Sequence, residues 1–403
     1  MKKIVITGMG AVTPIGIGVD KYWENLIAGV SGIDTLTRVD TERLNVKVGA
    51  EVKNFDASEY MSKKTEKELS LFMQYGYAAA MEALNQSGIE NGNDKMAVIM
   101  GTALSGITSV CETQKVVDEG KSSKVNPRFI TQAMGNICAS IIATEKQITG
   151  PCMTVGTACS SGGDALSLAC MTILCGDADA ALVVGAEATL TWTVISSLAT
   201  ARALSANPNP KSACCPFDES RSGFIMGEGG GAVVIETEES ALKRGAVILG
   251  EIAGFANNND AYHIMHPHPE GDGAKRCMQR ALDRAGMKPE EIGYINTHGT
   301  STKVGDVIET GAIKSIFGKN VPVSSTKAAT GHLMGAGGLT ELIACVNAVR
   351  YGVLPPTLNL KNPDPECDLD YIPNTARKCE INAAMSNAFG FGGQNSSIIV
   401  KKY

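Results

Sequence analysis

The sequence predicts an α/β protein built from two joined halves. Short apolar segments of strand character alternate with longer amphipathic segments along the whole chain, an order typical of βαβ units in a covered, largely parallel sheet. The alternation occurs before and again after about residue 250, although the halves share no letter-for-letter repeat. Because no linker rich in Pro, Ser or Gly separates them, we expect the two halves to pack as one body.

The elements follow from local patterns taken in chain order. Short apolar runs are predicted as strands: Lys3–Thr7, Ala97–Met100, Met153–Val155, Ala181–Val184, Ala232–Ile235, Tyr294–Thr297, Val321–Ser324 and Ser397–Val400. Longer amphipathic stretches are predicted as helices: Asp20–Ala28, Lys63–Gln86, Ser160–Leu174, Ala274–Ala285, Val307–Phe317 and Gly338–Arg350.

Composition narrows the class of protein. The chain has 403 residues, 44% hydrophobic, with 36 basic and 42 acidic side chains. It has no low-complexity tract, which excludes disorder and a fibrous repeat. Net acidity without stripes of Lys and Arg argues against nucleic acid as the main partner. No apolar run reaches the roughly 18 residues of a membrane span, so we expect no membrane association.

The twelve cysteines indicate a reducing compartment. None forms a CxxC pair, and Cys214 and Cys215 are adjacent, a poor geometry for a mutual disulfide. Scattered cysteines without a signal peptide are typical of reduced thiols in the cytosol, so the predicted localisation is cytoplasmic. Most should act as small buried hydrophobic residues.

Cys159 is the candidate nucleophile. It follows the predicted strand Met153–Val155 and precedes a helix that opens with Ser160 and Ser161. At such a turn the unpaired N–H groups and the helix dipole favour a thiolate. The small residues around it resemble those of a nucleophile elbow, so an exposed nucleophile is favoured over one more buried cysteine.

Two of the five histidines lie in loops of small residues beside predicted strands. His298 is in Thr-His-Gly-Thr-Ser-Thr, and His332 is in Thr-Gly-His-Leu-Met-Gly. In α/β sheets such strand ends are where sites are built. The other three histidines fall between His263 and His268 with two prolines; without a second ligand cluster, the sequence predicts no metal there.

The glycine-rich loops do not match nucleotide-binding motifs. Gly227–Gly231 and Gly390–Gly393 lead into predicted strands, whereas a phosphate cradle requires a following helix. The Gly-Phe-Gly-Gly loop instead allows backbone N–H groups to approach a ligand closely, with Phe391 as a moving lid.

These motifs together resemble the β-ketoacyl-[acyl-carrier-protein] synthases, and synthase II of bacterial fatty-acid synthesis in particular. The resemblance rests on Thr-Ala-Cys-Ser-Ser-Gly at 157–162, His-Gly-Thr-Ser-Thr at 298–302, Lys327 with Thr-Gly-His at 330–332, and Asn-Ala-Phe-Gly-Phe-Gly-Gly at 387–393. It implies a thiolase fold, a five-layered αβαβα body of two topologically equivalent halves. The expected division is 1–250, carrying the cysteine, and 251–403, carrying both histidines and the glycine loop.

The resemblance also implies a reaction. Cys159 would take an acyl group from a carrier protein as a thioester, and malonyl-carrier protein would then lose CO2 and attack it. His298 and His332 would stabilise the enolate, and the N–H groups of Cys159 and Phe391 would form the oxyanion hole. The helix N-terminus would supply the thiolate without a dedicated base.

Further roles follow from the same resemblance. Lys327 would orient His332 and set the local field. Thr300 and Thr302 would hold the phosphopantetheine arm. Glu309 is grouped with these substrate-binding residues and would support Lys327 without touching the substrate itself. No cofactor beyond the carrier's phosphopantetheine and no catalytic metal is expected. The family can hold a structural monovalent cation at positions that match Asn296, Glu341, Ser386 and Asn387.

The implied partner is an acidic acyl carrier protein, which requires a local basic patch on this acidic chain. Lys63, Lys64 and Lys67 share one face of a predicted helix, and Lys124 and Arg202 match other docking positions. The sequence departs from the family at Glu68, where a basic residue is usual, and at Ser123.

The acyl pocket departs from the family as well. Leu104 lies at the position that gates chain length in relatives, and Gln132 lies in the segment that lines the pocket of the dimer partner. Lys303 replaces a common proline, and Gln394 replaces Thr or His. These changes concern the substrate rather than the chemistry.

Two assignments remain open. The first is a homodimeric elongating ketosynthase of fatty-acid synthesis. The second is the ketosynthase subunit of a type II polyketide or polyene system, working as a heterodimer with a chain-length factor. A non-catalytic scaffold is disfavoured because Cys159, His298 and His332 are all present. A degradative thiolase is disfavoured because it would use a second cysteine as base, where this chain has a histidine motif. An initiating synthase is disfavoured because it would pair Cys with His and Asn, whereas this chain has two histidines.

Overall fold

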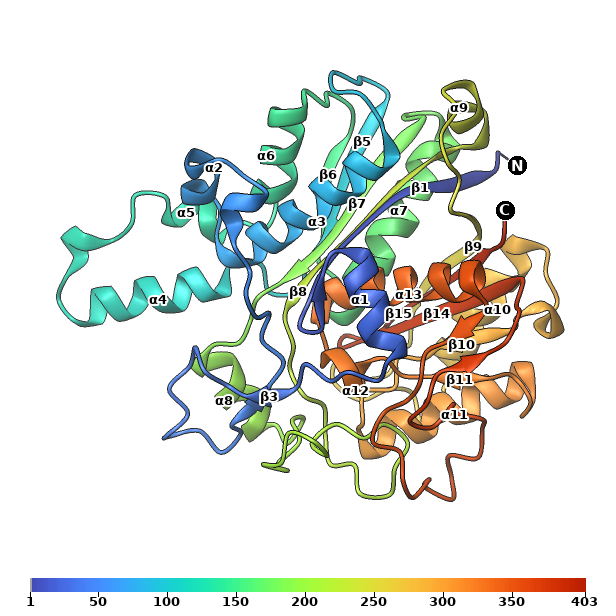
Figure 1. The fold of residues 1–403 in the computed structure, drawn as a ribbon. Helices are drawn as coiled ribbons and strands as arrows, with labels where there is room; N and C mark the ends of the chain where they lie inside the picture. Colours follow the sequence, from blue (N-terminus) through green and yellow to red (C-terminus); the bar gives the residue numbers. More distant parts are fainter. Residues whose placement is uncertain (1) are drawn as a thin grey trace.

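The computed structural model describes residues 2–403 and has an α/β architecture with one large mixed sheet at its centre (Figure 1). The main strands run in the order β11-β10-β14-β15-β9-β1-β8-β7-β5-β6, and β2 pairs with β1 at the side. Strands up to β8 come from the first part of the chain and strands from β9 onward from the second.

The strands have the following bounds. The first half contributes β1 (Ile4–Thr13), β2 (Gly16–Ile17), β5 (Met96–Gly101), β6 (Cys152–Val155), β7 (Ala180–Glu187) and β8 (Gly229–Thr237). The second half contributes β9 (Gly250–Asn259), β10 (Tyr294–Asn296), β11 (Val323–Ser324), β14 (Ala383–Gly390) and β15 (Gln394–Lys401). Two small ribbons pair β3 (Asp34–Thr35) with β4 (Val48–Gly49) and β12 (Val353–Leu354) with β13 (Arg377–Lys378).

The α-helices are α1 (Val19–Ile27), α2 (Lys63–Glu68), α3 (Leu71–Ser87), α4 (Ile107–Asp118), α5 (Phe129–Ala133), α6 (Ile137–Lys146), α7 (Ser161–Cys175), α8 (Trp192–Thr200), α9 (Glu238–Lys243), α10 (Asp272–Ala285), α11 (Lys303–Phe317), α12 (Lys327–Thr330) and α13 (Gly337–Tyr351). Short 3₁₀ turns include η3 (Ala158–Ser160) and η5 (Met334–Ala336).

The two halves have the same topology. When the five main strands of each half are numbered along the chain, both β1, β5, β6, β7, β8 and β9, β10, β11, β14, β15 take the order 3-2-4-5-1 across the sheet. In both halves the fifth strand runs antiparallel to its neighbours. The halves join where β1 pairs antiparallel with β9. The predicted two equivalent halves are therefore confirmed.

The expectation of a largely parallel sheet is wrong. Four neighbouring pairs among the main strands are parallel and five are antiparallel. The fifth strand of each half reverses direction. In the second half this reversal is a tight hairpin in which Gly390 pairs with Gln394. Gly392 and Gly393 inside it have φ of 86° and 73°, which glycine adopts without strain.

Helices α7 and α13 form the central layer of five. Helix α7 contacts β5 and β7 of its own half and also β9 and β15 of the other. Helix α13 contacts β10, β14 and β15 and also β7 and β8. Outside this core, α3 and α6 cover strands of the first half, and α10, with α11 packed on it, covers β9 and β15. The arrangement is the predicted αβαβα body (Figure 1).

The two central helices cross at glycines. A Cβ atom on Gly338 would lie 2.6 Å from the backbone nitrogen of Gly163, and one on Gly162 would lie 2.8 Å from the carbonyl oxygen of Gly335. Both distances are shorter than real side-chain contacts. The crossing therefore depends on residues without side chains.

One 18-residue window, 158–175, is long and apolar enough to cross a membrane by length and composition, which the sequence analysis overlooked. It coincides with η3 and α7, and 72% of it is buried. Its apolar character is explained by its place between the sheet strands of the first half and those of the second half, both of which α7 contacts.

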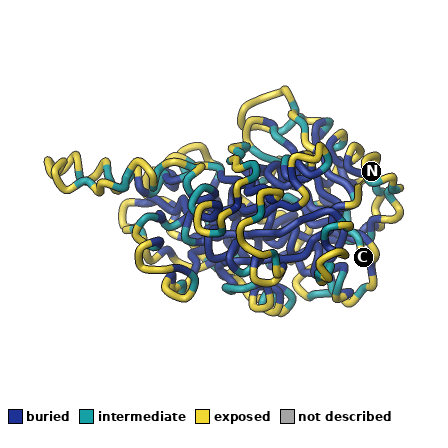
Figure 2. The backbone as a smooth tube through the Cα atoms, turned by 90° about the horizontal axis from the view of Figure 1, so that it is seen from above, coloured by how far each residue is buried: buried dark blue, intermediate teal, exposed yellow. Residues whose placement is uncertain are grey.

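An extended arm, residues 104–135, projects from one side of the body and carries α4 and α5 (Figures 1 and 2). In Figure 2 this arm is mostly exposed or half-buried, in contrast to the buried centre. Its exposed apolar side chains include Val110, Val117, Ile130 and Met134.

All eight predicted strands and all six predicted helical stretches are found, with shifted ends. The stretch predicted as one helix, Lys63–Gln86, is two helices: Leu69 leaves the helical conformation, and the Ser62 hydroxyl caps α2 by accepting from Thr65 N–H. Strands β9 and β14 were not predicted, because runs such as Ala-Asn-Asn-Asn and Ser-Asn-Ala lack an apolar pattern. Helices α4, α5, α6, α8, α9 and α12 were not predicted either.

We expect Gly338→Val to lower the free energy of unfolding by about 1–3 kcal/mol or to prevent folding, because the new side chain would overlap the α7 backbone. Urea denaturation measures this. Gly311→Ala on exposed α11 is the matched control: its Cβ meets nothing within 4 Å, so stability should stay equal or rise by up to about 1 kcal/mol. If the Gly338→Val protein is as stable as wild type, the claim that the α7–α13 crossing requires glycine at this position is wrong.

Candidate active site

Cys159 lies where β6 ends and α7 begins. The Cys159 turn, residues 156–160, is fixed by hydrogen bonds from Thr157 N–H to the Ser161 hydroxyl (2.9 Å) and from the Ser160 hydroxyl to Asp164 (2.8 Å). Ala158 has a φ of 51°, a left-handed conformation that is uncommon for alanine and marks a constrained turn. The sequence predicted an exposed elbow. Cys159 is instead buried, with 8% exposure.

A cavity of 340 Å³ lies over Cys159. Its wall combines residues from both halves of the chain. The predicted site residues that line it are Cys159, Arg202, His298, Thr300, Thr302, Glu309, His332 and Phe391. The structure thus brings together most of the side chains that the motifs singled out.

The sulfur of Cys159 and one ring nitrogen each of His298 and His332 all lie within 4.8 Å of one another. The two imidazole rings meet edge to face, with centroids 5.3 Å apart. Three connecting segments deliver these groups: Cys159 lies between β6 and α7, His298 between β10 and α11, and His332 between α12 and η5. Cys159 lies 139 residues before His298 and 173 residues before His332, yet the three side chains form one reactive cluster.

His332 is held in one tautomer. Its Nδ1 accepts a hydrogen bond from Met334 N–H (3.3 Å), so the ring proton of the neutral form is on Nε2. Its backbone is bound on both sides, by Ile225 carbonyl and Gly227 N–H. Burial, reinforced by the charge of Lys327, holds the pKa of His332 well below its usual range. A neutral His332 thus offers an N–H donor to a substrate.

His298 begins a second tightly held segment, the His298 turn (residues 298–303). The Glu309 carboxylate accepts from His298 N–H (2.8 Å) and Gly299 N–H (2.7 Å). Burial first, and then the charge of Lys327, keep the pKa of His298 well below its usual range, so this imidazole is neutral as well. Glu309 therefore positions the turn. Burial raises its own pKa to about 7, and the N–H groups of the turn and the charge of Lys327 only partly oppose this rise.

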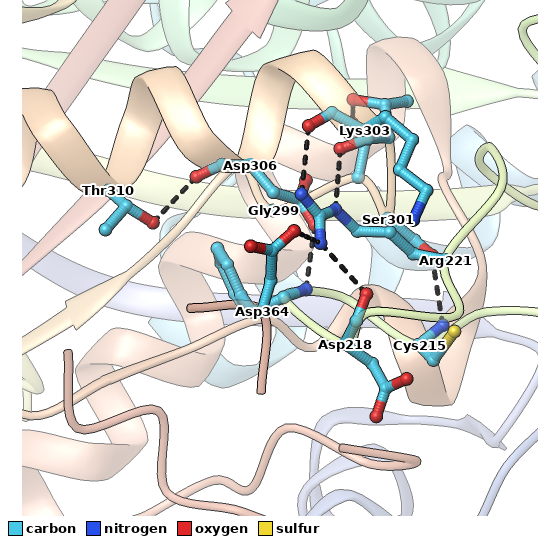
Figure 3. Close-up of polar contacts among 12 residues, drawn as sticks. Cys215, Asp218, Arg221, Gly299, Ser301, Lys303, Asp306, Thr310 and Asp364 are labelled. Atoms are coloured by element: carbon cyan, nitrogen blue, oxygen red, sulfur yellow. Dashed lines mark hydrogen bonds and ion pairs between the residues drawn. The ribbon is translucent and has the colours of Figure 1, made fainter. Parts of the chain in front are cut away.

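The other side of the His298 turn rests on buried Arg221 (Figure 3). The guanidinium donates to the carbonyls of Thr302 (3.0 Å) and Lys303 (2.9 Å), and it also binds Asp364 (2.8 Å). Only arginine has the planar fork of donors that this pattern requires. Ser301, with φ of 66°, completes the anchoring, because its hydroxyl accepts from Cys215 N–H. The sequence analysis missed Arg221.

The hydroxyls of Thr300 and Thr302 lie 3.2 Å apart on this turn and face the cavity. They form a paired polar site at the cavity wall, and their binding of the substrate arm stays a prediction.

Lys327 is buried and makes an ion pair with Glu341 on α13. It makes no hydrogen bond to His332 in the described chain, where Met334 and Ile225 hold that residue instead. The expectation that Lys327 orients His332 directly is therefore wrong. Its charge acts through space and lowers the pKa of both site histidines.

The expectation of a low-pKa thiolate is contradicted. Burial raises the pKa of Cys159 to about 11, and the Phe391 N–H and the charge of Lys327 only partly oppose this rise. The resting site therefore holds a thiol between two neutral imidazoles, and deprotonation needs a nearby acceptor.

Phe391 is half-exposed at the cavity, on the hairpin between β14 and β15. Its backbone N–H is directed at the Cys159 sulfur. Gly390 packs against the Cys159 turn so closely that a Cβ there would lie 3.0 Å from the Thr157 carbonyl. The Gly-Phe-Gly-Gly loop therefore brings a backbone donor to the nucleophile; its role in an oxyanion hole and the movement of Phe391 as a lid stay predictions.

Leu104 and Gln132 lie outside this cavity. Leu104 is 45% exposed at the base of the arm, and Gln132 on α5 donates to the Lys67 carbonyl (3.1 Å). The neighbouring Ala103 packs in the same apolar cluster as Cys159, which places the predicted acyl-pocket segment behind the nucleophile.

The five predicted docking cations are all exposed. Lys63, Lys64 and Lys67 lie on α2, Lys124 lies on the arm, and of the five only Arg202 lines the cavity.

Glu68, the residue that departs from the family pattern, makes an ion pair with Arg128 of the arm (2.8 Å). Its charge is therefore balanced locally.

The loop of three histidines contributes Met265, His266 and Pro267 to the cavity mouth. The Nδ1 atom of His263 accepts from Met265 N–H (3.0 Å) and His266 N–H (3.2 Å), which shapes the loop. In residues 2–403, Cys159, His298 and His332 form the one cluster of three side chains with metal-ligand spacing. The absence of a catalytic metal stays a prediction.

The residues implied for a structural monovalent cation fit such an ion. Asn296 and Ser386 are paired neighbours on β10 and β14. The buried Asn296 Oδ1 has no hydrogen-bond donor. Glu341 is also buried. These oxygens would hold the ion, which would supply structure rather than chemistry.

Comparisons with known proteins agree with this geometry. Residues 1–241 match the N-terminal domain of the beta-ketoacyl synthases and residues 249–361 match their C-terminal domain. The chain belongs to the β-ketoacyl synthase family. Two curated relatives, each named 3-oxoacyl-[acyl-carrier-protein] synthase 2, are 42% identical: one from Staphylococcus aureus over 100% of this chain and 99% of its own, and one from Synechocystis over 100% and 98%.

Solved ketosynthase structures share the fold over the whole chain. The ishigamide ketosynthase/chain length factor has a TM-score of 0.93 at 32% identity and covers 100% of this chain and 99% of its own. A type II polyketide ketosynthase in complex with its acyl-carrier protein has a TM-score of 0.91 at 30% identity and covers 100% of both chains. This β-ketoacyl synthase is thus an acyltransferase with the thiolase fold.

We expect the alkylation rate of Cys159 by iodoacetamide to rise by about tenfold per pH unit up to about pH 9, because the thiolate is a minor species below pH 11. Peptide mapping follows Cys159 separately from the exposed Cys152 and Cys175. A rate that levels off between about pH 6 and 8 would contradict the raised pKa.

Proposed function

We propose that this synthase condenses an acyl group carried on Cys159 with malonyl-[acyl-carrier-protein], giving 3-oxoacyl-[acyl-carrier-protein], CO2 and free carrier protein in fatty-acid elongation. The observation that carries this proposal is the meeting of one thiol and two neutral imidazoles, 4.8 Å or less apart, at one cavity. The names of the 42% identical relatives support the substrate class.

In the first half-reaction the Cys159 sulfur attacks the acyl carbonyl of an acyl-carrier protein. Because the buried thiol is protonated at neutral pH, its proton passes to a ring nitrogen of His298 as the sulfur attacks. His332 does not accept it, because its Nδ1 is bound by Met334 N–H and its Nε2 already carries a proton. The carbon–sulfur bond to phosphopantetheine breaks, and the departing carrier thiolate takes that proton. Proton transfer to an imidazole replaces the expectation that the N-terminus of α7 supplies the thiolate without a base.

In the second half-reaction the bond between the malonyl carboxylate and its carbon breaks and CO2 leaves. The electron pair forms an enolate, whose oxygen accepts hydrogen bonds from the ring N–H groups of His332 and His298. The enolate carbon attacks the acyl-Cys159 carbonyl, and the Cys159 and Phe391 N–H groups stabilise the tetrahedral oxygen. The carbon–sulfur bond then breaks, and the released Cys159 thiolate takes up a proton.

Neutral histidines suit this role. A protonated imidazole would attract the malonyl carboxylate and stabilise the ground state, whereas a neutral donor acts where negative charge develops on the enolate oxygen. Thr300 and Thr302, beside His298, would bind the phosphopantetheine arm, which is the only prosthetic group we expect.

The carrier protein is the proposed partner. The exposed cations Lys63, Lys64, Lys67 and Lys124 would attract an acidic carrier, and Arg202 at the cavity mouth would lie beside the entering arm. Twelve free cysteines support the expected cytosolic location.

We also propose a dimer, with a second copy of this chain as the partner. Strand β6 is the last strand of the sheet, and Cys152 and Met153 on it are exposed. The exposed apolar side chains of the arm, such as Ile130 and Met134, add to an apolar face that another subunit would cover. Division of the chain at 250/251 is likewise a proposal; this boundary falls at the start of β9, the first strand of the second half.

The second candidate is the ketosynthase subunit of a type II polyketide system, with a chain-length factor in place of the second copy. The shared fold with ketosynthases of that class supports it, at lower identity than the synthase 2 relatives. Both candidates use the same reactive cluster.

We expect Cys159→Ala to abolish acyl-enzyme formation, seen as loss of the added acyl mass after incubation with acyl-carrier protein. The dimer should remain, because Cys159 lies at the cavity rather than on the exposed arm. If the variant still accumulates a covalent acyl-enzyme, the assignment of the nucleophile is wrong.

His332→Ala should retain self-acylation at Cys159 and lose CO2 release from malonyl-carrier protein by about 10²–10³-fold, the typical cost of removing one oxyanion donor. Acyl-enzyme mass and released CO2 are measured on the same preparation. Equal loss of both half-reactions would assign His332 a structural role.

A further inference from the structure

Glu187 joins two loops of the active site through one carboxylate. It is the last residue of β7 and is fully buried. Its oxygens accept from the N–H groups of Ala103 (2.6 Å) and Leu104 (3.2 Å), which follow β5, and from Gly335 N–H (3.2 Å), three residues after His332. The Thr102 hydroxyl lies 3.4 Å away.

This carboxylate is held by backbone donors. Burying a carboxylate costs several kcal/mol unless its oxygens are well satisfied. Burial raises the pKa of Glu187 to about 7, and the N–H groups of both loops oppose that rise. The N–H donors of both loops must therefore stay on the carboxylate, which restrains the two loops relative to each other.

The loops also touch directly at Gly335. A Cβ atom there would lie 2.7 Å from Ala103 nitrogen and 2.8 Å from a Glu187 oxygen, so only glycine permits the contact. The preceding residue, Met334, donates its N–H to His332 Nδ1. Glu187 therefore restrains Gly335, which is adjacent in sequence to Met334, the residue whose N–H orients the His332 ring.

We propose that Glu187 is a positioning residue that sets the place of Leu104 at the acyl-pocket segment and of the His332 ring at the thioester. This inference rests on the proposed function, and it links the predicted acyl-pocket segment, which contains Leu104, to His332, the residue proposed to act on the malonyl thioester. Glu187 lies outside the wall of the cavity and touches neither substrate, so its effect acts through the two loops.

The test is Glu187→Gln, which keeps the size of the side chain but turns an NH2 group toward N–H donors. We expect kcat for CO2 release to fall by about 10- to 100-fold, as for small displacements of reacting groups. KM for malonyl-carrier protein should change less than about twofold, because Thr300 and Thr302 lie on the separate His298 turn. The range of acyl chains accepted on Cys159 should shift.

Gly335→Ala tests the same contact from the other loop, and it serves if Glu187→Gln does not fold. Its added methyl would press on the carboxylate, so the same kcat loss and chain-length shift are expected.

Glu236→Gln is the matched control. Glu236 is fully buried on the neighbouring strand β8 and binds Thr7 (2.7 Å), Ser240 (2.9 Å) and Arg244, none of which belongs to the site. It should lower the melting temperature while leaving kcat and chain preference unchanged for the folded protein.

Wild-type kcat and chain preference in folded Glu187→Gln would overturn the inference, as would losses that match those of Glu236→Gln. Failure of the wild-type protein to form acyl-enzyme or release CO2 would instead overturn the proposed function, so the two failures are distinguishable.

Discussion

The close crossing of α7 and α13 is the constraint on which the site depends. Their N-termini carry the Cys159 turn and η5, which contact each other only because Gly162, Gly163 and Gly338 let the two backbones approach. Each helix follows the third main strand of its half, so the equivalence of the halves brings two loops to the same place. One loop supplies a nucleophile and the other, through His332, supplies a hydrogen-bond donor.

Burial then decides the protonation of the three reactive groups, Cys159, His298 and His332. It keeps His298 and His332 neutral, and it keeps Cys159 a thiol by raising its pKa to about 11. Lys327 provides the local positive charge, and its partner Glu341 keeps that charge in place. Both histidine donors are therefore neutral before the substrate binds. Negative charge develops beside them only when the enolate forms, so their hydrogen bonds stabilise the enolate selectively.

The sequence identified the reactive residues because each lies in a local motif of small residues between a strand and a helix. The fold class and the duplication also followed from local patterns. Arg221 and Glu187 could not be found in this way. Arg221 binds a carbonyl 81 residues away, and Glu187 binds an N–H group 148 residues away, and neither residue type nor spacing marks such contacts. The raised pKa of Cys159 depends on burial, which no motif reports.

The most direct test of the central claim is intact-mass analysis of carrier-protein products. The purified chain alone receives a medium-chain acyl-carrier protein and malonyl-carrier protein. The account predicts one product, a 3-oxoacyl-carrier protein extended by two carbons. Self-acylation without extension, restored only by adding a chain-length-factor subunit, would contradict the homodimeric fatty-acid assignment, and no acylation at all would contradict the chemistry assigned to the site.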